Sequence, residues 1–341
     1  MEILKRQHGG SEPMTESPAI QADGLSKTYS EGLVFRKRFA ALKSVTFTVE
    51  RGEIYGLLGP NGAGKTTFLK ILLGIISKSS GQASLMGFPA GSRAGRRLVG
   101  YLPEHLRIPP HMTAYTALEC YGNLSNVSNR IVREKRDGLL ELVGLADRSK
   151  DRCKNYSKGM LQRLGLAQTL LHDPDLVVLD EPTDGLDPGA RAEMRDVIHK
   201  LADKGVTIFL NSHLLHEVEM TCKQVAILDR GNLRYSGPVD KIGDYVNSLG
   251  GEGHQSASIE LTVSGDPEAI HQSFAERTFE ILNRISESEF TVRVDSADQA
   301  ATDQLVDQLR SNDVSLIELS HSQVSLEDAF LKIVEDGSAQ T

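Results

Sequence analysis

Nine consecutive residues, from Gly59 to Thr67, have the types and spacing that hold a polyphosphate. They match the phosphate-loop template G-x-x-x-x-G-K-[ST], and they lie between a strand-like apolar run and a helix-like one. Glycines let successive backbone amides point at phosphate oxygens, and the following helix directs its positive end at the same charge. We therefore predict a nucleotide-binding loop made of Gly59, Pro60, Asn61, Gly62, Ala63, Gly64, Lys65, Thr66 and Thr67. Lys65 would reach the β- and γ-phosphates, and Thr66 would offer its hydroxyl to Mg²⁺.

Two adjacent carboxylates follow a second apolar run, Leu176 to Leu179. Neighbouring residues of a strand face opposite ways, so Asp180 and Glu181 can take different roles. Asp180 is suited to bind Mg²⁺ directly or to hold one of the ligands of the ion, and Glu181 is suited to polarise an attacking water molecule.

An alternation of short apolar runs and helical patterns, from Ile20 to about Val239, must position these residues. It predicts an α/β domain with a mainly parallel sheet, in which ligand sites lie at the carboxyl ends of the strands. The expected strands are Ala40 to Glu50, Ile54 to Leu58, Leu98 to Leu102, Leu176 to Leu179, Val206 to Leu210 and Gln224 to Leu228. Between them, a helical insert is expected from Thr113 to Leu124, Ile131 to Val143 and Ser157 to Leu171.

Composition limits the classes of function. The 341 residues carry a formal charge of −8, which argues against a nucleic-acid partner held by bulk electrostatics. Three widely spaced cysteines fit a reducing cytosol. No apolar run approaches the roughly 18 residues of a membrane span, so we expect any membrane role to come through a partner. The polar segment 1–18 is predicted to be a disordered leader.

The character of the sequence changes after Pro238, and a linker is predicted over residues 241–256. Residues 257–341 predict a small α+β domain of βαββαβ type followed by a helix. Its expected elements are strand Ala257 to Val263, helix Pro267 to Arg277, strands Phe279 to Asn283 and Phe290 to Val294, helix Ala297 to Ser311, strand Ser315 to Leu319 and helix Leu326 to Val334. Without a phosphate loop or metal cluster, it is expected to regulate or to bind a partner.

The segment Tyr156 to Arg163, Tyr-Ser-Lys-Gly-Met-Leu-Gln-Arg, resembles the LSGGQ-x-QR signature of the ATP-binding cassette (ABC) family. With the two earlier motifs in the family's order, the resemblance covers about residues 19–240. It implies a P-loop cassette fold: a mainly parallel sheet, an antiparallel β subdomain and a helical insert. It also implies that Ser157 and Gly159 contact, in trans, the nucleotide of a second cassette. From the residues alone, Ser157 is expected to cap the following helix.

The resemblance assigns further roles. Asp187 would organise the interface between two cassettes, His213 would contact the γ-phosphate as the switch histidine, and Tyr29 would stack on adenine. Three positions depart from the family pattern. Lys158 and Met160 replace the usual glycine and glutamine of the signature, and Glu104 replaces a glutamine that reaches Mg²⁺. A carboxylate at residue 104 can also bind the metal, at the cost of added negative charge beside a triphosphate.

The function implied by the resemblance is that of an ATPase subunit, with ATP and Mg²⁺ as cofactors and Glu181, His213 and Lys65 as catalytic residues. The subunit would act in a transporter, and its short C-terminal domain resembles those of bacterial exporters. Its partners would be a second cassette, identical or paralogous, and a separate multi-spanning membrane permease. It would lie peripherally on the cytoplasmic face of the bacterial cell membrane.

Two alternatives stay open. The first is a soluble cassette ATPase that acts on ribosomes or DNA, although such relatives usually carry two cassettes or a long coiled-coil insert, and this chain shows no sustained heptads. The second is a regulatory protein that binds ATP without turnover. The presence of Lys65, Thr66, Asp180, Glu181 and His213 argues against it.

Overall fold

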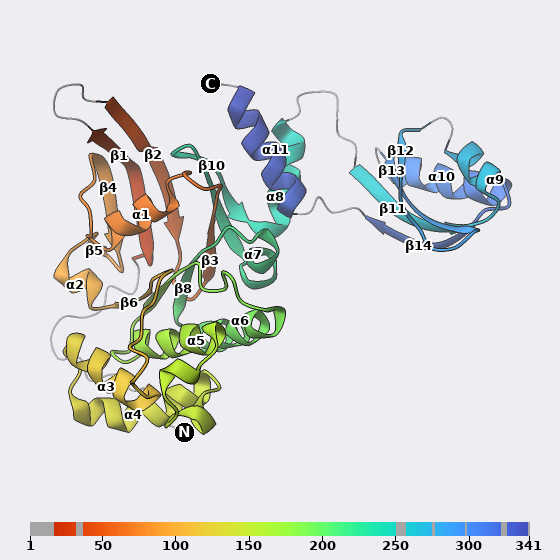
Figure 1. The fold of residues 1–341 in the computed structure, drawn as a ribbon. Helices are drawn as coiled ribbons and strands as arrows, with labels where there is room; N and C mark the ends of the chain where they lie inside the picture. Colours follow the sequence, from red (N-terminus) through yellow and green to blue (C-terminus); the bar gives the residue numbers. More distant parts are fainter. Residues whose placement is uncertain are drawn as a thin grey trace. The chain divides into compact units, whose positions relative to one another are not determined.

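The computed structural model describes residues 17–31, 37–249, 257–274, 277–296, 299–321 and 326–339 (Figure 1). Two compact units divide the chain: residues 1–239 with 337–341, and residues 240–336. Most of the predicted leader, residues 1–16, lies outside the described residues.

A six-stranded sheet forms the centre of the first unit, in the order β10-β9-β3-β8-β7-β6. Its strands are β3 (Ile54–Leu58), β6 (Val99–Leu102), β7 (Leu176–Asp180), β8 (Thr207–Asn211), β9 (Gln224–Asp229) and β10 (Asn232–Pro238). All pairings are parallel except that of β9 with β10. Every residue of β3, β7 and β8 is buried, as in parallel strands covered on both faces. The predicted mainly parallel sheet is confirmed.

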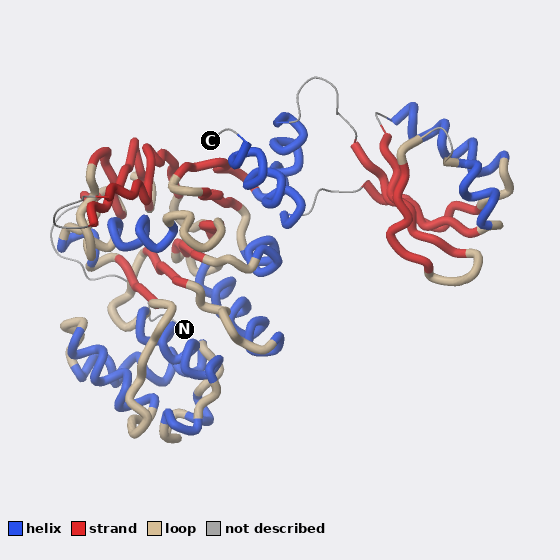
Figure 2. Tube along the Cα trace, turned by 45° about the horizontal axis from the view of Figure 1, so that its top comes forward, coloured by secondary structure: helices blue, strands red, loops and turns tan. Residues whose placement is uncertain are grey.

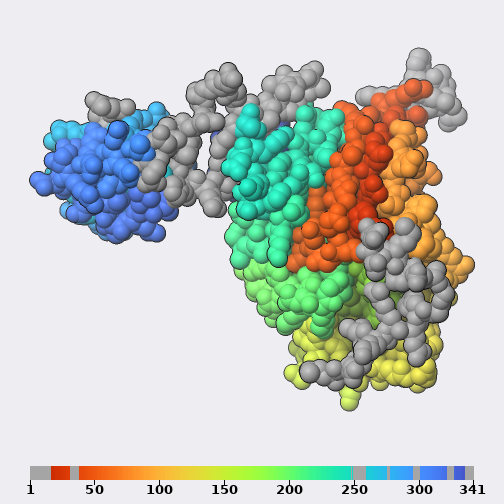
Figure 3. All heavy atoms as spheres, turned by 180° about the vertical axis from the view of Figure 1, so that it is seen from behind, coloured from red at the N-terminus to blue at the C-terminus, as the bar shows by residue number. Residues whose placement is uncertain are grey.

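A second, antiparallel sheet in this unit has the order β2-β1-β4-β5. Its strands are β1 (Ile20–Glu31), β2 (Lys37–Val49), β4 (Ser80–Leu85) and β5 (Phe88–Pro89). In Figure 3 the red and orange surface of β1 and β2 adjoins green surface, which belongs to a later part of the chain. Gly231 connects the two: Lys43 N donates to its oxygen (2.7 Å), and its own amide donates to Ala63 O (2.9 Å). The antiparallel sheet is thereby tied to the phosphate loop.

The helices of the first unit are α1 (Lys65–Leu72), α2 (Arg93–Arg96), α3 (Ala114–Leu124), α4 (Asn129–Leu142), α5 (Lys158–Thr169), α6 (Pro188–Ala202) and α7 (Leu215–Thr221). Most of these helices, although not α1 or α7, start at a residue whose side chain caps them. Thr113, Ser128 and Ser157 each accept a hydrogen bond from the first turn of the helix that follows. These helices confirm the predicted helical insert. In the described part of the chain, no helix has both the length and the hydropathy that crossing a lipid bilayer requires.

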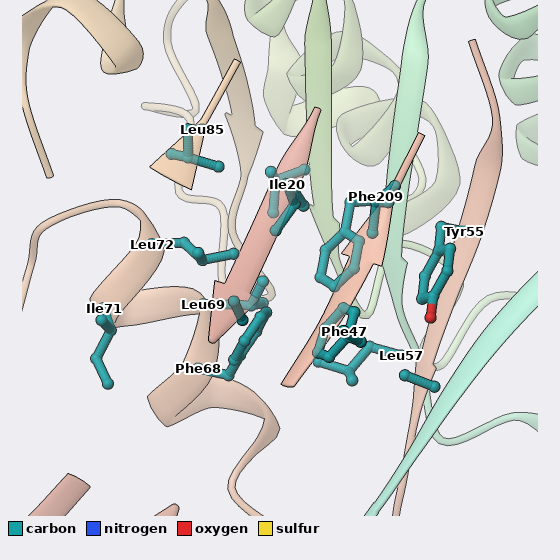
Figure 4. Close-up of a cluster of buried hydrophobic side chains, with 14 of the residues drawn as sticks. Ile20, Phe47, Tyr55, Leu57, Phe68, Leu69, Ile71, Leu72, Leu85 and Phe209 are labelled. Atoms are coloured by element: carbon teal, nitrogen blue, oxygen red, sulfur yellow. The ribbon is translucent and has the colours of Figure 1, made fainter. Parts of the chain in front are cut away.

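An aromatic cluster holds α1 against the sheets (Figure 4). Phe47 of β2 stacks on Phe68 of α1, with ring centroids 5.0 Å apart. The ring centroids of Tyr55 and Phe209 lie 5.7 and 6.5 Å from that of Phe47. Burying a side chain of this size contributes about 1.5–3 kcal/mol. Phe68 lies one residue beyond Thr67, so this cluster also fixes the start of α1, which follows the phosphate loop.

The second unit contains the predicted βαββαβ module (Figure 2). Its elements are β11 (Ala257–Ser264), α9 (Pro267–Ser273), β12 (Phe279–Arg284), β13 (Glu289–Ser296), α10 (Gln299–Ser311) and β14 (Ser315–His321), and α11 (Leu326–Ala339) follows. The strand order β12-β13-β11-β14 is antiparallel throughout. Side chains of both helices, such as Ile270 and Leu305, form one core with Leu261 and Val292. The predicted α+β module is confirmed.

The predicted linker over residues 241–256 is wrong in its first half. Helix α8 (Ile242–Leu249) occupies it, and residues 250–256 lie outside the described residues. Ile242 and Val246 are spaced one helical turn apart and are 2% and 5% exposed. This buried apolar face stabilises the helix. The linker was predicted because residues 241–256 are rich in glycine, and the helical spacing of the apolar residues was given too little weight.

Candidate functional site

The phosphate loop connects the buried strand β3 to α1 and packs closely against the backbone of β2 and β9. Gly64 has φ +108°, and a Cβ there would stand 2.4 Å from Ala41 O. A Cβ on Gly59 would lie 2.3 Å from Leu228 O. Glycine is therefore required at both positions, because a larger residue would push the loop away from the neighbouring strands.

Lys65 lies at the start of α1 and is 6% exposed. Its Nζ donates to Gly59 O at 2.6 Å, so the side chain folds back over the loop. Burial lowers the pKa of Lys65, while the carboxylates of Glu181, Asp180 and Glu104 act in the opposite direction. The bonds of Lys65 Nζ in this structure go to the backbone oxygens of Gly59 and Pro60, so the charge of this poorly solvated amine can act on an anionic ligand in the loop.

Asp180 ends β7 and is 4% exposed. Its Oδ2 accepts from Tyr101 Oη (3.2 Å), and its Oδ1 accepts from Asn211 Nδ2 (2.6 Å). The two donors come from β6 and β8, which flank β7, so three adjacent strand ends fix one carboxylate. Burial raises the pKa of Tyr101, and the nearby Asp180 carboxylate raises it further. The phenol therefore stays protonated and can donate.

Glu181 follows at once and faces His213. The carboxylate Oε2 is 2.8 Å from His213 Nδ1 and also accepts from the backbone amide of His213 at 3.3 Å. Burial is the largest effect on Glu181 and raises its pKa, which makes the ionised form a stronger base; contacts with His213 act against this. The residue has φ +51°, a conformation that costs about 1–3 kcal/mol in non-glycine residues and is common at active sites.

An aromatic pair lines the opposite side of the site. Tyr29 of β1 lies across from Phe39 of β2, and their side chains are 39% and 61% exposed. Lys27 Nζ stands 5.0 Å from the Tyr29 ring centroid. Exposed flat rings beside a phosphate loop can stack on a base.

These parts enclose a cleft of about 360 Å³. The predicted residues that line it are Tyr29, Pro60, Asn61, Gly62, Ala63, Gly64, Lys65, Thr66, Thr67, Glu104, Glu181 and His213. Gly59 and Asp180 lie directly behind it through their bonds to Lys65 and Asn211. Four further residues line the cleft without having been predicted to do so: Phe39, Ala41, Asp184 and Asn211.

Three predicted residues lie outside this cleft. Ser157 caps α5, as predicted, by accepting from Met160 N at 3.2 Å. Gly159 packs so closely on α6 that a Cβ would stand 2.7 Å from Ala190 Cβ. Asp187 caps α6 by accepting from Ala190 N at 2.9 Å. Within their own chain, these residues thus cap helices and pack α5 against α6.

The arrangement combines the groups that phosphoryl transfer to water requires. A glycine-rich loop and a buried lysine can bind polyphosphate, and a carboxylate with raised pKa can accept a proton from water. His213 is placed to hold that carboxylate in position, and the aromatic pair can hold a base by stacking.

Comparisons with known proteins agree with this chemistry. A family model described as ABC transporter matches residues 42–184. A second model, described as an AAA domain of a putative AbiEii toxin in a type IV toxin–antitoxin system, matches residues 152–219.

Similarity to individual proteins extends over almost the whole chain. An uncharacterized ABC transporter ATP-binding protein of Synechocystis is 37% identical over 96% of this chain and 89% of its own length. The bacitracin transport ATP-binding protein BcrA of Bacillus licheniformis is 34% identical over 89% and 96%. The linearmycin resistance ATP-binding protein LnrL of Bacillus subtilis is 29% identical over 92% and 97%.

Solved structures share the fold of the first unit. An ATP-binding subunit of an ABC transporter has a TM-score of 0.58 and 29% identity, over 69% of this chain and 95% of its own. A dimeric ATP-binding cassette in a post-hydrolysis state, bound to ADP and Pi, has a TM-score of 0.56 and 21% identity, over 64% and 98%.

Proposed function

The chain belongs to the ATP-binding proteins of ABC transporters, and we propose that it powers an exporter by hydrolysing ATP in the cleft between the phosphate loop and Glu181. The observation that carries the catalytic assignment is the pair of Glu181 and His213, 2.8 Å apart, in the same cleft as Lys65. Lys65 binds the phosphates, Glu181 accepts a proton from the attacking water, and His213 orients Glu181. Lys65 and His213 stabilise negative charge on the transferring phosphoryl group.

Mg²⁺ fits the oxygen groups at this site. Mg²⁺ takes oxygen ligands and is usually held by one or two carboxylates together with the phosphates of a substrate. Thr66, Asp180 and Glu104 would supply the protein ligands. When bound, Mg²⁺ neutralises phosphate charge. Hydrogen bonds from Tyr101 and Asn211 already fix the Asp180 carboxylate, which supports Asp180 as one of the protein ligands.

Replacing Glu104 by glutamine is expected to keep ATP binding and to leave turnover within about tenfold of the parent. The Glu104 side chain is 47% exposed, and the bond from Gln162 reaches its backbone oxygen, which the change preserves. Phosphate release measured across a Mg²⁺ titration checks this, and loss of the proposed carboxylate ligand should raise the Mg²⁺ concentration that gives half-maximal activity. Abolished turnover would instead give the carboxylate an essential role.

We propose that two copies, or one copy and a paralogue, bind ATP across a shared interface. Ser157, Gly159 and Asp187 lie outside the cleft of their own chain, and Ser157 opens α5, whose positive end suits an anion. A cassette of similar fold is a dimer with ADP and Pi, which supports the same arrangement here. ATP binding would close the interface, and hydrolysis would release it.

The proposal of an exporter rests on the relatives. Those named for bacitracin transport and linearmycin resistance align over most of their own length. We propose a separate multi-spanning permease as the partner, with this chain on the cytoplasmic face of the membrane. The βαββαβ module after the cassette is proposed to regulate or to bind a partner, and ATPase activity after its removal tests that role.

Purification of tagged Glu181→Gln from gently solubilised native cells, with Mg-ATP present, tests the transporter proposal. A multi-spanning membrane protein in stoichiometric amount, identified by mass spectrometry, is the expected result. A Lys65→Met bait in the same preparation controls for capture that does not depend on ATP. Recovery of ribosomal or DNA-associated proteins alone would overturn the proposal in favour of a soluble machine.

A further inference from the structure

Lys158, the first residue of α5, contacts the loop Asp184–Asp187 of its own chain, here called the D-loop. Its Nζ lies 3.5 Å from Asp184 Oδ2. The same nitrogen packs on the backbone of Gly185, where an added Cβ would stand only 2.5 Å from it. Gly185 has φ +62°, a backbone conformation that favours glycine. Lys158 therefore touches the D-loop through its charge and through direct packing.

Asp184 is shared between Lys158 and the hydrolytic pair. Its other oxygen, Oδ1, lies 3.9 Å from His213 Nε2, while His213 Nδ1 lies 2.8 Å from Glu181. The Asp184 amide also donates to Glu181 O at 3.2 Å. Close contacts thus run from Lys158 through Asp184 and His213 to Glu181, all within one chain.

The start of α5 has little freedom to move away from the D-loop. Gly159, next to Lys158, is in close contact with Ala190 in the first turn of α6. Asp187, the last D-loop residue, caps that same turn through Ala190 N. The backbone that carries Lys158 is therefore held at a fixed distance from the loop that its side chain contacts.

We propose that Lys158 is a positioning residue for hydrolysis in its own subunit: it holds Asp184, which in turn orients the His213 ring against Glu181. The inference rests on the proposed roles of Glu181 and His213. It adds that a signature residue acts on the cleft of its own chain as well as lying near that of a second copy. Since Lys158 and Asp184 are about half exposed, at 53% and 45%, the effect is modest.

A double-mutant cycle tests the connection, with Lys158→Met, Asp184→Asn and the combined variant compared by steady-state ATPase kinetics. Each single change is expected to lower kcat about twofold to fivefold, with KM for ATP changed by less than about twofold. The combined variant should be no slower than Asp184→Asn, because Lys158 acts through Asp184. Lys158→Arg, which keeps the charge, should recover most of the rate. Lys154→Met, an exposed lysine four residues earlier, is the matched control and should keep the parent kcat.

The inference would be overturned if the reductions in kcat of the two single variants multiplied in the combined variant, or if the changes affected mainly KM. Either result would place Lys158 on the nucleotide of a second copy. A parent that does not hydrolyse Mg-ATP would count against the proposed function instead.

Hydrogen exchange gives a readout that does not need turnover. D-loop amides are expected to exchange at least about twofold faster in Lys158→Met, and strand β7 should be unchanged. D-loop exchange equal to that of the parent would also overturn the inference.

Discussion

Exchanging Glu181 for glutamine is expected to slow ATP hydrolysis about 100-fold to 10,000-fold while ATP binding is retained. Glutamine has the same shape, and its oxygen can still accept from the His213 amide, which lies 3.3 Å from Glu181 Oε2 in the parent. It cannot accept a proton from water, and this is the role that burial and the raised pKa favour for Glu181. Phosphate release and equilibrium ATP titration measure the two effects separately.

The change from Glu134 to glutamine is the matched control. Glu134 lies on α4 with its side chain 57% exposed, and it pairs with Arg130 away from the cleft. Its variant should turn over at the parent rate.

Glu181→Gln should also sediment as a dimer with Mg-ATP and as a monomer with ADP. Parent-like hydrolysis by Glu181→Gln would remove Glu181 from the role of base.

The sequence could predict the phosphate loop and the acidic strand end because each is contiguous. Gly59 to Thr67 carries its own chemistry in nine neighbouring residues, and the turn geometry follows from its glycines. The burial of β3 and β7 on both faces likewise follows from unbroken apolar runs. The pattern of single segments therefore predicted both the fold class and the central residues of the site.

The remaining lining residues depend on contacts between segments far apart in the chain. Phe39 reaches the cleft because the register of β1 and β2 pairs it with Tyr29. Asn211 reaches Asp180 because β7 and β8 are aligned in parallel at these residues. One cue was present in the sequence: Asn211 directly follows the predicted strand Val206 to Leu210 and lies two residues before His213, at the edge where such sheets bind ligands.

The signature segment, residues 156–163, shows a different limit of prediction from sequence. Its pattern correctly predicts the cap by Ser157, which is a local interaction. The contact of Lys158 with Asp184 joins two segments 26 positions apart, and nothing in either segment alone indicates it. A departure from the family pattern thus acquires a physical role only when the fold brings its partner beside it.

Exchanging Lys65 for methionine is expected to weaken Mg-ATP binding by about 30-fold or more, the effect of about 2 kcal/mol or more for a buried charge that loses its partner. The Lys65 amine is almost fully enclosed, so its attraction to a triphosphate is poorly screened by water. Methionine fills a similar volume, which keeps the start of α1 packed while the charge is lost. The negative side chains of Glu181, Asp180 and Glu104 then face the phosphates without a compensating cation, so binding and turnover fall together.

Equilibrium titration with ATP, with and without Mg²⁺, measures this loss, and Lys70→Met is the matched control. Lys70 lies on the same helix and is exposed, so removing its charge should leave the affinity within about twofold. The two variants separate a local charge effect from any general effect of a methionine on α1. If Lys65→Met bound Mg-ATP as tightly as Lys70→Met, the backbone amides and the helix end would account for phosphate binding, and Lys65 would be left with a role in hydrolysis alone.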